Sequence, residues 1–188
     1  MTVVAENPLL EGLRLRRRPD PCILVIFGAS GDLTSKKLMP ALYALAVRGL
    51  LPEKFGVVGA ARTEETDDEF RERMKQAVQE HARDPFDDEV WSRLAEGMRY
   101  VTLDFADDKG EDQLRTCLTS LDEDIGTGGN RVYYFAVPPS AIGTLVEEIA
   151  ERRGAEGWIR LIVEKPFGHA LASARELNAQ IQRHFVEG

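Results

Sequence analysis

Short runs of β-branched and aromatic residues alternate along the chain with longer segments in which apolar residues recur every three or four positions. Short continuous apolar runs are typical of strands buried on both faces, and the longer spacing is typical of amphipathic helices. The predicted strands are residues 22–28, 55–61, 99–105, 131–137 and 159–165. The predicted helices are residues 34–48, 66–81, 86–96, 109–121, 139–152 and 171–186.

The strict alternation of strand and helix predicts an α/β fold of Rossmann type. Right-handed crossovers then place helices on both faces of a doubly wound, mainly parallel sheet. We expect this domain to span residues 22–188 and to follow a flexible N-terminal tail, residues 1–21. The basic cluster in the tail, residues 14–18, either is solvated, which we favour, or contacts a polyanion.

The composition narrows the classes of function. Of the 188 residues, 43% are hydrophobic and 30% are charged, as in ordinary soluble globular proteins. The net charge of −8 argues against a nucleic-acid partner, and no apolar run is long enough to span a membrane. The two cysteines, Cys22 and Cys117, form neither a disulfide framework nor a metal-ligand spacing. We therefore expect no metal and a reducing, cytoplasmic setting.

A glycine turn joins the first predicted strand directly to a helix. Gly28 ends the strand and Gly31 begins the helix, so backbone N–H groups can approach a pyrophosphate at the helix N-terminus. The spacing departs from G-x-G-x-x-G because Ser30 stands where the second glycine is expected, and no P-loop lysine follows. The alternative is a tight turn that needs glycine for its geometry alone. The position at the first of five alternating strands favours a nucleotide.

The end of the second strand bears on the choice between NAD and NADP. In Rossmann proteins an acid there binds the ribose 2′-hydroxyl, whereas an arginine accommodates a 2′-phosphate. This chain has Arg62 and Thr63 in place of the acid. A guanidinium matches a phosphate well, so the sequence favours NADP. The alternative is an ordinary surface arginine.

The fifth predicted strand ends in Lys165, followed by Pro166. A lysine at the carboxyl end of a strand points toward the cleft of such a fold, where it can bind a phosphate or a hydroxyl near the nicotinamide. The alternative is an ordinary strand-end lysine with a turn proline.

Four segments together resemble one family. They are GASGDLTSKK at 28–37, GAAR at 59–62, NRVYYFAVPPS at 130–140 and EKPFG at 164–168. In this order and at these spacings they resemble glucose-6-phosphate dehydrogenase, over residues 22 to 188.

The resemblance implies roles for individual residues. Arg62 would hold the 2′-phosphate of NADP, Lys37 would face the sugar, and Lys165 would contact both substrate and coenzyme, with Pro166 as a hinge. Leu103 and Asp104 would lie near the adenine. The pyrophosphate would be cradled by Gly28, Ala29, Ser30, Gly31, Asp32 and Leu33. The chain departs from the family at Thr34, where alanine is commoner, and at Ile142, where some relatives have a tyrosine beside the coenzyme.

The resemblance also implies an enzymatic activity, but part of the catalytic machinery that it requires is not among these residues. The family oxidises glucose 6-phosphate to 6-phosphoglucono-lactone and forms NADPH, the first step of the oxidative pentose phosphate pathway. Its general-base histidine, its sugar-phosphate segment and its C-terminal β+α domain are expected beyond residue 188, so no catalytic residue is assigned here. His81, His169 and His184 match none of the family's catalytic segments.

We therefore expect residues 22–188 to be the coenzyme-binding part of that enzyme and to be inactive alone. The full-length enzyme is expected to be a homo-oligomer, and the present chain to be monomeric or weakly associated. We also expect an open sheet edge with an apolar patch where the second domain docks. Two alternatives stay open, a free-standing NADP-binding sensor and a non-catalytic structural module.

Overall fold

The structure is a computed structural model and describes residues 19–103, 108–151, 156–164 and 171–185. Several predicted features lie outside these residues: the basic cluster of the tail, Asp104, Lys165, Pro166 and His169.

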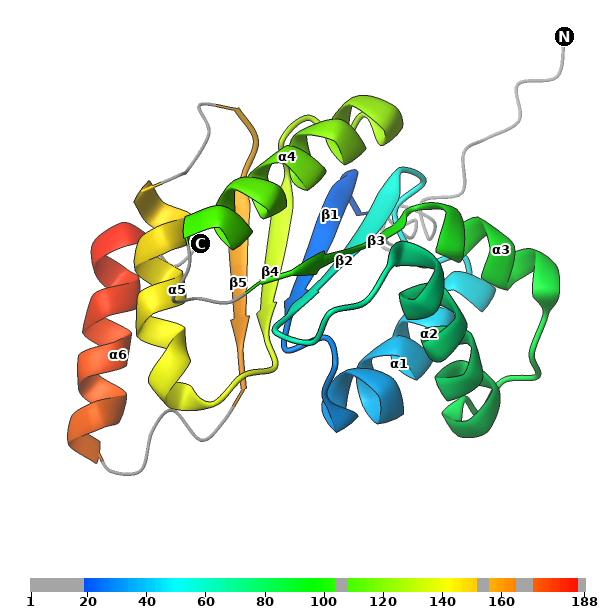
Figure 1. The fold of residues 1–188 in the computed structure, drawn as a ribbon, viewed down its shortest axis with the longest axis horizontal. Helices are drawn as coiled ribbons and strands as arrows, with labels where there is room; N and C mark the ends of the chain where they lie inside the picture. Colours follow the sequence, from blue (N-terminus) through cyan, green and yellow to red (C-terminus); the bar gives the residue numbers. More distant parts are fainter. Residues whose placement is uncertain (1–18, 104–107, 152–155, 165–170, 186–188) are drawn as a thin grey trace, which may run out of the picture.

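Five parallel strands form one sheet in the order β3-β2-β1-β4-β5 (Figure 1). The strands are β1 (Cys22–Phe27), β2 (Phe55–Ala61), β3 (Met98–Thr102), β4 (Arg131–Phe135) and β5 (Ile159–Val163). The chain winds outward from β1 in one direction through β2 and β3 and then returns to build β4 and β5 on the other side. The predicted doubly wound α/β fold is therefore confirmed, and the described strands are all parallel.

Helices cover both faces of the sheet (Figure 1). On one face lie α1 (Met39–Val47), α2 (Asp67–His81) and α3 (Asp88–Glu96), and on the other lie α4 (Asp108–Ile125), α5 (Pro139–Glu151) and α6 (Leu171–His184). Each face has its own apolar core. The whole of β1 is buried because it lies between both cores, which explains its continuous apolar sequence, CILVIF.

The first helix contains a π-helical segment near its start. Residues Thr34–Leu38 form a π-helix, η2, which runs directly into α1. Single π-helical turns are uncommon and are found frequently at functional sites. The predicted helix 34–48 is thus correct in extent, but its first turns have a different hydrogen-bond pattern.

Other predicted boundaries shift as well, and β4 and β5 each end two residues early, at Phe135 and Val163. Strand β3 ends at Thr102, and α4 continues to Ile125, four residues beyond the predicted end at 121. The added turn of α4 carries Asp122, which binds the loop that follows, as described below.

Strand β5 forms an outer edge of the sheet. Its residues alternate between half-buried and exposed, and Ile162 is 42% exposed. Among the described residues no further strand pairs with β5.

Candidate functional site

The glycine turn lies at the carboxyl end of β1, between β2 and β4. The chain moves to opposite sides of β1 in its two halves, so this is the point where the strand order reverses. Ligands of open parallel sheets bind in the crevice at such a point, because the adjacent crossover connections leave the sheet in opposite directions.

Gly28 is required by the shape of the turn. Its φ is +86°, and a Cβ atom added there would lie 2.2 Å from the carbonyl oxygen of Ala136. The N–H groups of Gly28 and Ala29 both donate to the carbonyl of Ala60, at 2.8 and 3.2 Å. These contacts fix the turn between β2 on one side and the end of β4 on the other.

The turn closes on itself through short hydrogen bonds. The N–H of Gly31 donates to the carbonyl of Gly28 at 3.0 Å, and the hydroxyl of Thr34 donates to the same carbonyl at 3.3 Å. Thr34, which departs from the family pattern, therefore helps to hold the turn from its buried position. Ser30, Gly31 and the side chain of Asp32 remain exposed.

The helix that follows the turn has an open N-terminus. Leu33, which directly precedes η2, makes no side-chain hydrogen bond to the helix, and Asp32 is the acidic residue at the start of the helix. By contrast, Thr66 caps α2 in a capping box with Glu69, and Asp87 caps α3. The first N–H groups of a helix have no partner within the helix, so this N-terminus offers donors and partial positive charge to an anion.

Two lysines flank this N-terminus. Lys36 forms an ion pair with Asp32 at 2.9 Å, which partly neutralises the only acid in the turn. Lys37 is exposed on η2. The predicted phosphate residues Gly28 to Leu33 are therefore brought together in one turn, with cations beside them.

Arg62 lies next to this turn. It follows directly on β2, two residues after Ala60, whose carbonyl binds the turn. The side chain of Arg62 is exposed, and within the described part of the chain it makes no ion pair or hydrogen bond. A free guanidinium thus stands beside the open helix N-terminus.

Arg73 connects the glycine turn with the loop that follows Arg62. The sequence alone does not identify this residue. Its guanidinium binds both carboxylate oxygens of Glu65, at 2.6 and 2.7 Å. It also donates to the carbonyl of Ala29, at 3.3 and 3.4 Å, and to the hydroxyl of Ser35 at 3.4 Å. One arginine on α2 therefore ties the loop after Arg62 to the glycine turn. No local pattern indicates it, because Arg73 and Ala29 are 44 residues apart.

The loop after Arg62 is also held from β3. The hydroxyl of Tyr100 donates to the carbonyl of Thr63 at 2.7 Å, and burial raises the pKa of Tyr100 to about 12. Because the phenol keeps its proton at neutral pH, this hydrogen bond persists there.

Leu103, which the sequence predicts near the adenine, lies at the carboxyl edge of the sheet with its side chain turned into the core. Its N–H donates to the carbonyl of Ala61 at 2.8 Å, which places its backbone at the carboxyl edge of the sheet. Its side chain, however, is 1% exposed and belongs to the core under α4. Ile142, the second departure from the family pattern, is likewise buried in that core.

The two described histidines lie away from the glycine turn. His81 and His184 are the last residues of α2 and α6, which start near the carboxyl edge of the sheet and run for 15 and 14 residues. At 1.5 Å per residue, each helix carries its histidine roughly 20 Å away from that edge. Among the described residues no group of three His, Cys, Asp or Glu side chains could hold a metal ion. No described helix is long and apolar enough to cross a bilayer.

The parallel sheet, the glycine turn at its point of reversal and the open helix N-terminus define a dinucleotide-binding domain of Rossmann type. Comparison with known proteins gives the family. Residues 25–188 match the family described as glucose-6-phosphate dehydrogenase, NAD binding domain, and the chain belongs to that family.

Curated relatives agree with this assignment. The chain is 46% identical to glucose-6-phosphate 1-dehydrogenase 2 of Mycobacterium tuberculosis, over 96% of the chain and 36% of the relative. It is 39% identical to glucose-6-phosphate 1-dehydrogenase of Chlamydia pneumoniae, over 100% of the chain and 38% of the relative. The chain thus spans little more than a third of the length of these relatives.

Solved structures show the same fold. A glucose-6-phosphate dehydrogenase in complex with its substrate glucose-6-phosphate superposes with a TM-score of 0.77 at 30% identity, covering 89% of this chain and 35% of that one. The glucose-6-phosphate 1-dehydrogenase of Mycobacterium avium gives a TM-score of 0.71 at 34% identity, with 89% and 34% covered.

Proposed function

We propose that this chain is the coenzyme-binding part of an NADP-dependent glucose-6-phosphate dehydrogenase. The observation that carries the proposal is the exposed, unpaired Arg62 beside a glycine turn that a side chain at position 28 would block. Family membership and the names of the relatives support the activity.

The residues fit a dinucleotide with a 2′-phosphate. The helix N-terminus that follows the glycine turn suits the pyrophosphate, and the guanidinium of Arg62 suits the 2′-phosphate. Since the Leu103 side chain is buried, it is the backbone of Leu103 that would approach the adenine, together with Asp104.

When bound, NADP accepts a hydride. In the proposed reaction NADP, held by the glycine turn and Arg62, would supply the hydride acceptor for C1 of glucose 6-phosphate, and the C1 hydroxyl would give its proton to a general base to leave the lactone. This chain contributes binding and orientation, with Lys165 and Lys37 proposed to hold the sugar near the coenzyme. Such positioning accounts for a large share of enzymatic rate enhancement.

We further propose that the enzyme works in the cytoplasm and that the complete protein is a homo-oligomer. Both cysteines of the chain, Cys22 and Cys117, are free, which suits a reducing compartment.

Coenzyme titration of the purified chain tests the proposal. We expect NADP to bind more tightly than NAD, and Arg62→Ala to remove most of the difference, because a charge-assisted contact of this kind contributes about 1–3 kcal/mol. Isothermal calorimetry measures both affinities. Arg83→Ala, at an exposed arginine beyond the end of α2, is the matched control and should leave both unchanged. Equal affinities of the unmodified chain for the two coenzymes would contradict the NADP preference.

A further inference from the structure

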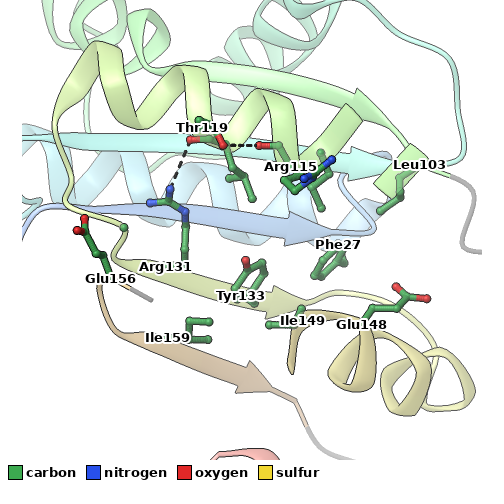
Figure 2. A pocket seen from close by; sticks show the side chains of 13 residues that line it. Phe27, Leu103, Arg115, Thr119, Arg131, Tyr133, Glu148, Ile149, Glu156 and Ile159 are labelled. Carbon is green, nitrogen blue, oxygen red and sulfur yellow. Dashed lines mark hydrogen bonds between the residues drawn. The ribbon is translucent and has the colours of Figure 1, made fainter. Parts of the chain in front are cut away.

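A cavity of about 320 Å³ lies between α4, α5 and the sheet (Figure 2). It opens on the face opposite to α1 and α2, and none of the described residues 28–33 of the glycine turn lines it. It is therefore separate from the candidate coenzyme site, although Phe27 and Leu103 at its edge come from the ends of β1 and the segment after β3.

The walls of the cavity are mainly apolar. The α4 side provides Leu118, the α5 side provides Ile149, and the strands provide Phe27 and Ile159. The rings of Phe27 and Tyr133 stand side by side on neighbouring strands, with their centroids 5.9 Å apart and their planes 8° from parallel. Flat aromatic groups thus form part of the floor.

One polar group inside the cavity has no partner. Tyr133 is only 8% exposed, and in the described part of the structure its hydroxyl makes no hydrogen bond. Figure 2 shows the side chain rising from β4 into the space below α4. The neighbouring Tyr134 points to the other face and donates to Glu164. A buried hydroxyl without a hydrogen-bond partner is unfavourable, so a bound group that pairs with it is favoured.

The two arginines that line the cavity are already engaged. Arg131 donates to the Thr127 hydroxyl at 3.1 Å and to the Leu118 carbonyl at 3.4 Å, and it lies 3.5 Å from the Asp122 carboxylate. Arg115 pairs with Asp112 at 2.9 Å. The carboxylates of Glu148 and Glu156 also line the cavity. An anionic ligand would have to displace the partners of the arginines, and a cationic ligand would lie against the two guanidinium groups, whereas an uncharged ligand leaves the pairs intact.

We propose that this cavity is a second binding site, for a small uncharged aromatic molecule with one hydrogen-bonding group that pairs with the Tyr133 hydroxyl. An apolar cavity of about 150 Å³ is large enough for benzene, so the volume here suits a bicyclic ring. The stacked floor and the aliphatic walls suit its flat faces. The inference is independent of the coenzyme and substrate proposed above.

Indole and indene test the proposal, because the two probes share one shape and only indole has an N–H group. We expect indole to bind the chain more tightly than indene in an NMR titration. Tyr133→Phe should weaken indole about 3- to 10-fold, as expected for one hydrogen bond, and should leave indene unchanged. Tyr134→Phe is the matched control and should change neither affinity, since that hydroxyl faces the opposite side of the sheet.

Two variants that fill the cavity locate the probe. Leu118→Phe and Ile149→Phe add a ring from α4 and from α5, and either variant that keeps the native circular dichroism spectrum should abolish binding of both probes. Indole that binds no more tightly than indene would overturn the proposal. So would indole affinity that survives Tyr133→Phe or a folded cavity-filling variant.

Discussion

Gly28 shows how a single backbone position makes the turn possible. A positive φ costs a residue with a side chain about 1–2 kcal/mol, and here the side chain would also meet the Ala136 carbonyl at 2.2 Å. Gly49 separates these two effects, because its φ is +61° but nothing lies within 4 Å of an added Cβ. The glycine turn is therefore fixed by a close approach of backbone to backbone as well as by its dihedral angles.

We expect Gly28→Ala to lower the free energy of unfolding by about 3 kcal/mol or more, and Gly49→Ala to lower it by only about 1–2 kcal/mol. Urea denaturation of the two variants measures the difference. Similar losses would mean that the contact with Ala136 relaxes easily. Gly28→Ala should also weaken NADP binding, whereas Gly49→Ala should leave it unchanged.

At the scale of elements, α2 stabilises the candidate coenzyme site through the side chain of Arg73. The Glu65 side chain is only 10% exposed and both its oxygens are bound by Arg73, which also reaches the carbonyl of Ala29. The guanidinium of Arg73 therefore holds two segments together: the loop that carries Arg62, and the glycine turn.

We expect Arg73→Met to leave the largely buried carboxylate of Glu65 unpaired and to lower the free energy of unfolding by about 1–3 kcal/mol. It should also weaken NADP binding several-fold and reduce the preference over NAD, because Arg62 loses its fixed loop. Calorimetric titration with both coenzymes, combined with urea denaturation, measures the two effects. Arg48→Met removes an exposed pair with Asp84 and should cost less than about 1 kcal/mol without changing coenzyme affinity. If Arg73→Met keeps the same ratio of NADP affinity to NAD affinity, then Arg73 stabilises the fold but does not position Arg62 for the coenzyme.

The connection from α4 to β4 depends on one carboxylate. Asp122 accepts hydrogen bonds from the hydroxyl and N–H of Thr127 and from the N–H of Gly129, and it lies 3.5 Å from the guanidinium of Arg131. Burial acts to raise the pKa of Asp122, but the Thr127 hydrogen bond and the charge of Arg131 outweigh it, so the pKa lies below its usual 3.8.

A lowered pKa means that the Asp122 carboxylate stabilises the fold fully above about pH 4 and ceases to do so as the pH falls through its folded-state pKa. We expect Asp122→Asn to be less stable than the unmodified chain at pH 7, with the difference shrinking below about pH 4. Thermal denaturation between about pH 3 and 7 measures it. Asp112→Asn, at an exposed pair on the same helix, should show almost no such pH dependence. A constant difference over the whole range would contradict this role of Asp122.

At the scale of the whole molecule, the described residues place no histidine beside the candidate coenzyme site. Both described histidines, His81 and His184, end helices that run away from the carboxyl edge of the sheet. We expect the chain to be stabilised by NADP, by about 2.7 kcal/mol at 100 times the dissociation constant. We also expect it to form no NADPH from glucose 6-phosphate at a useful rate.

Differential scanning fluorimetry and absorbance at 340 nm measure these two outcomes on the same sample. A turnover near the ordinary enzyme value of about 10 s⁻¹ would show that the chemistry lies within this chain. Stabilisation by NAD equal to that by NADP would argue against the proposed coenzyme.

The strands and their helices could be predicted because burial leaves a local mark on the sequence. A strand such as β1, covered on both faces, is apolar at every position, and the glycines at its end mark the turn. The position of Arg62 followed from the same logic, since it stands where β2 ends. The π-helical start at Thr34–Leu38 left no such mark, because its apolar spacing is also compatible with an α-helix.

The sequence by itself thus determined the alternating fold, the glycine turn and the arginine after β2, each of which depends on residues close together in the chain. The tertiary structure alone decided which distant side chains meet. Arg73 reaches Ala29 only because α2 packs beside the start of the first helix. The Tyr133 hydroxyl faces a cavity only because α4 and α5 leave a space above β4. Such contacts depend on how elements cross in space, and no periodicity along the chain records that.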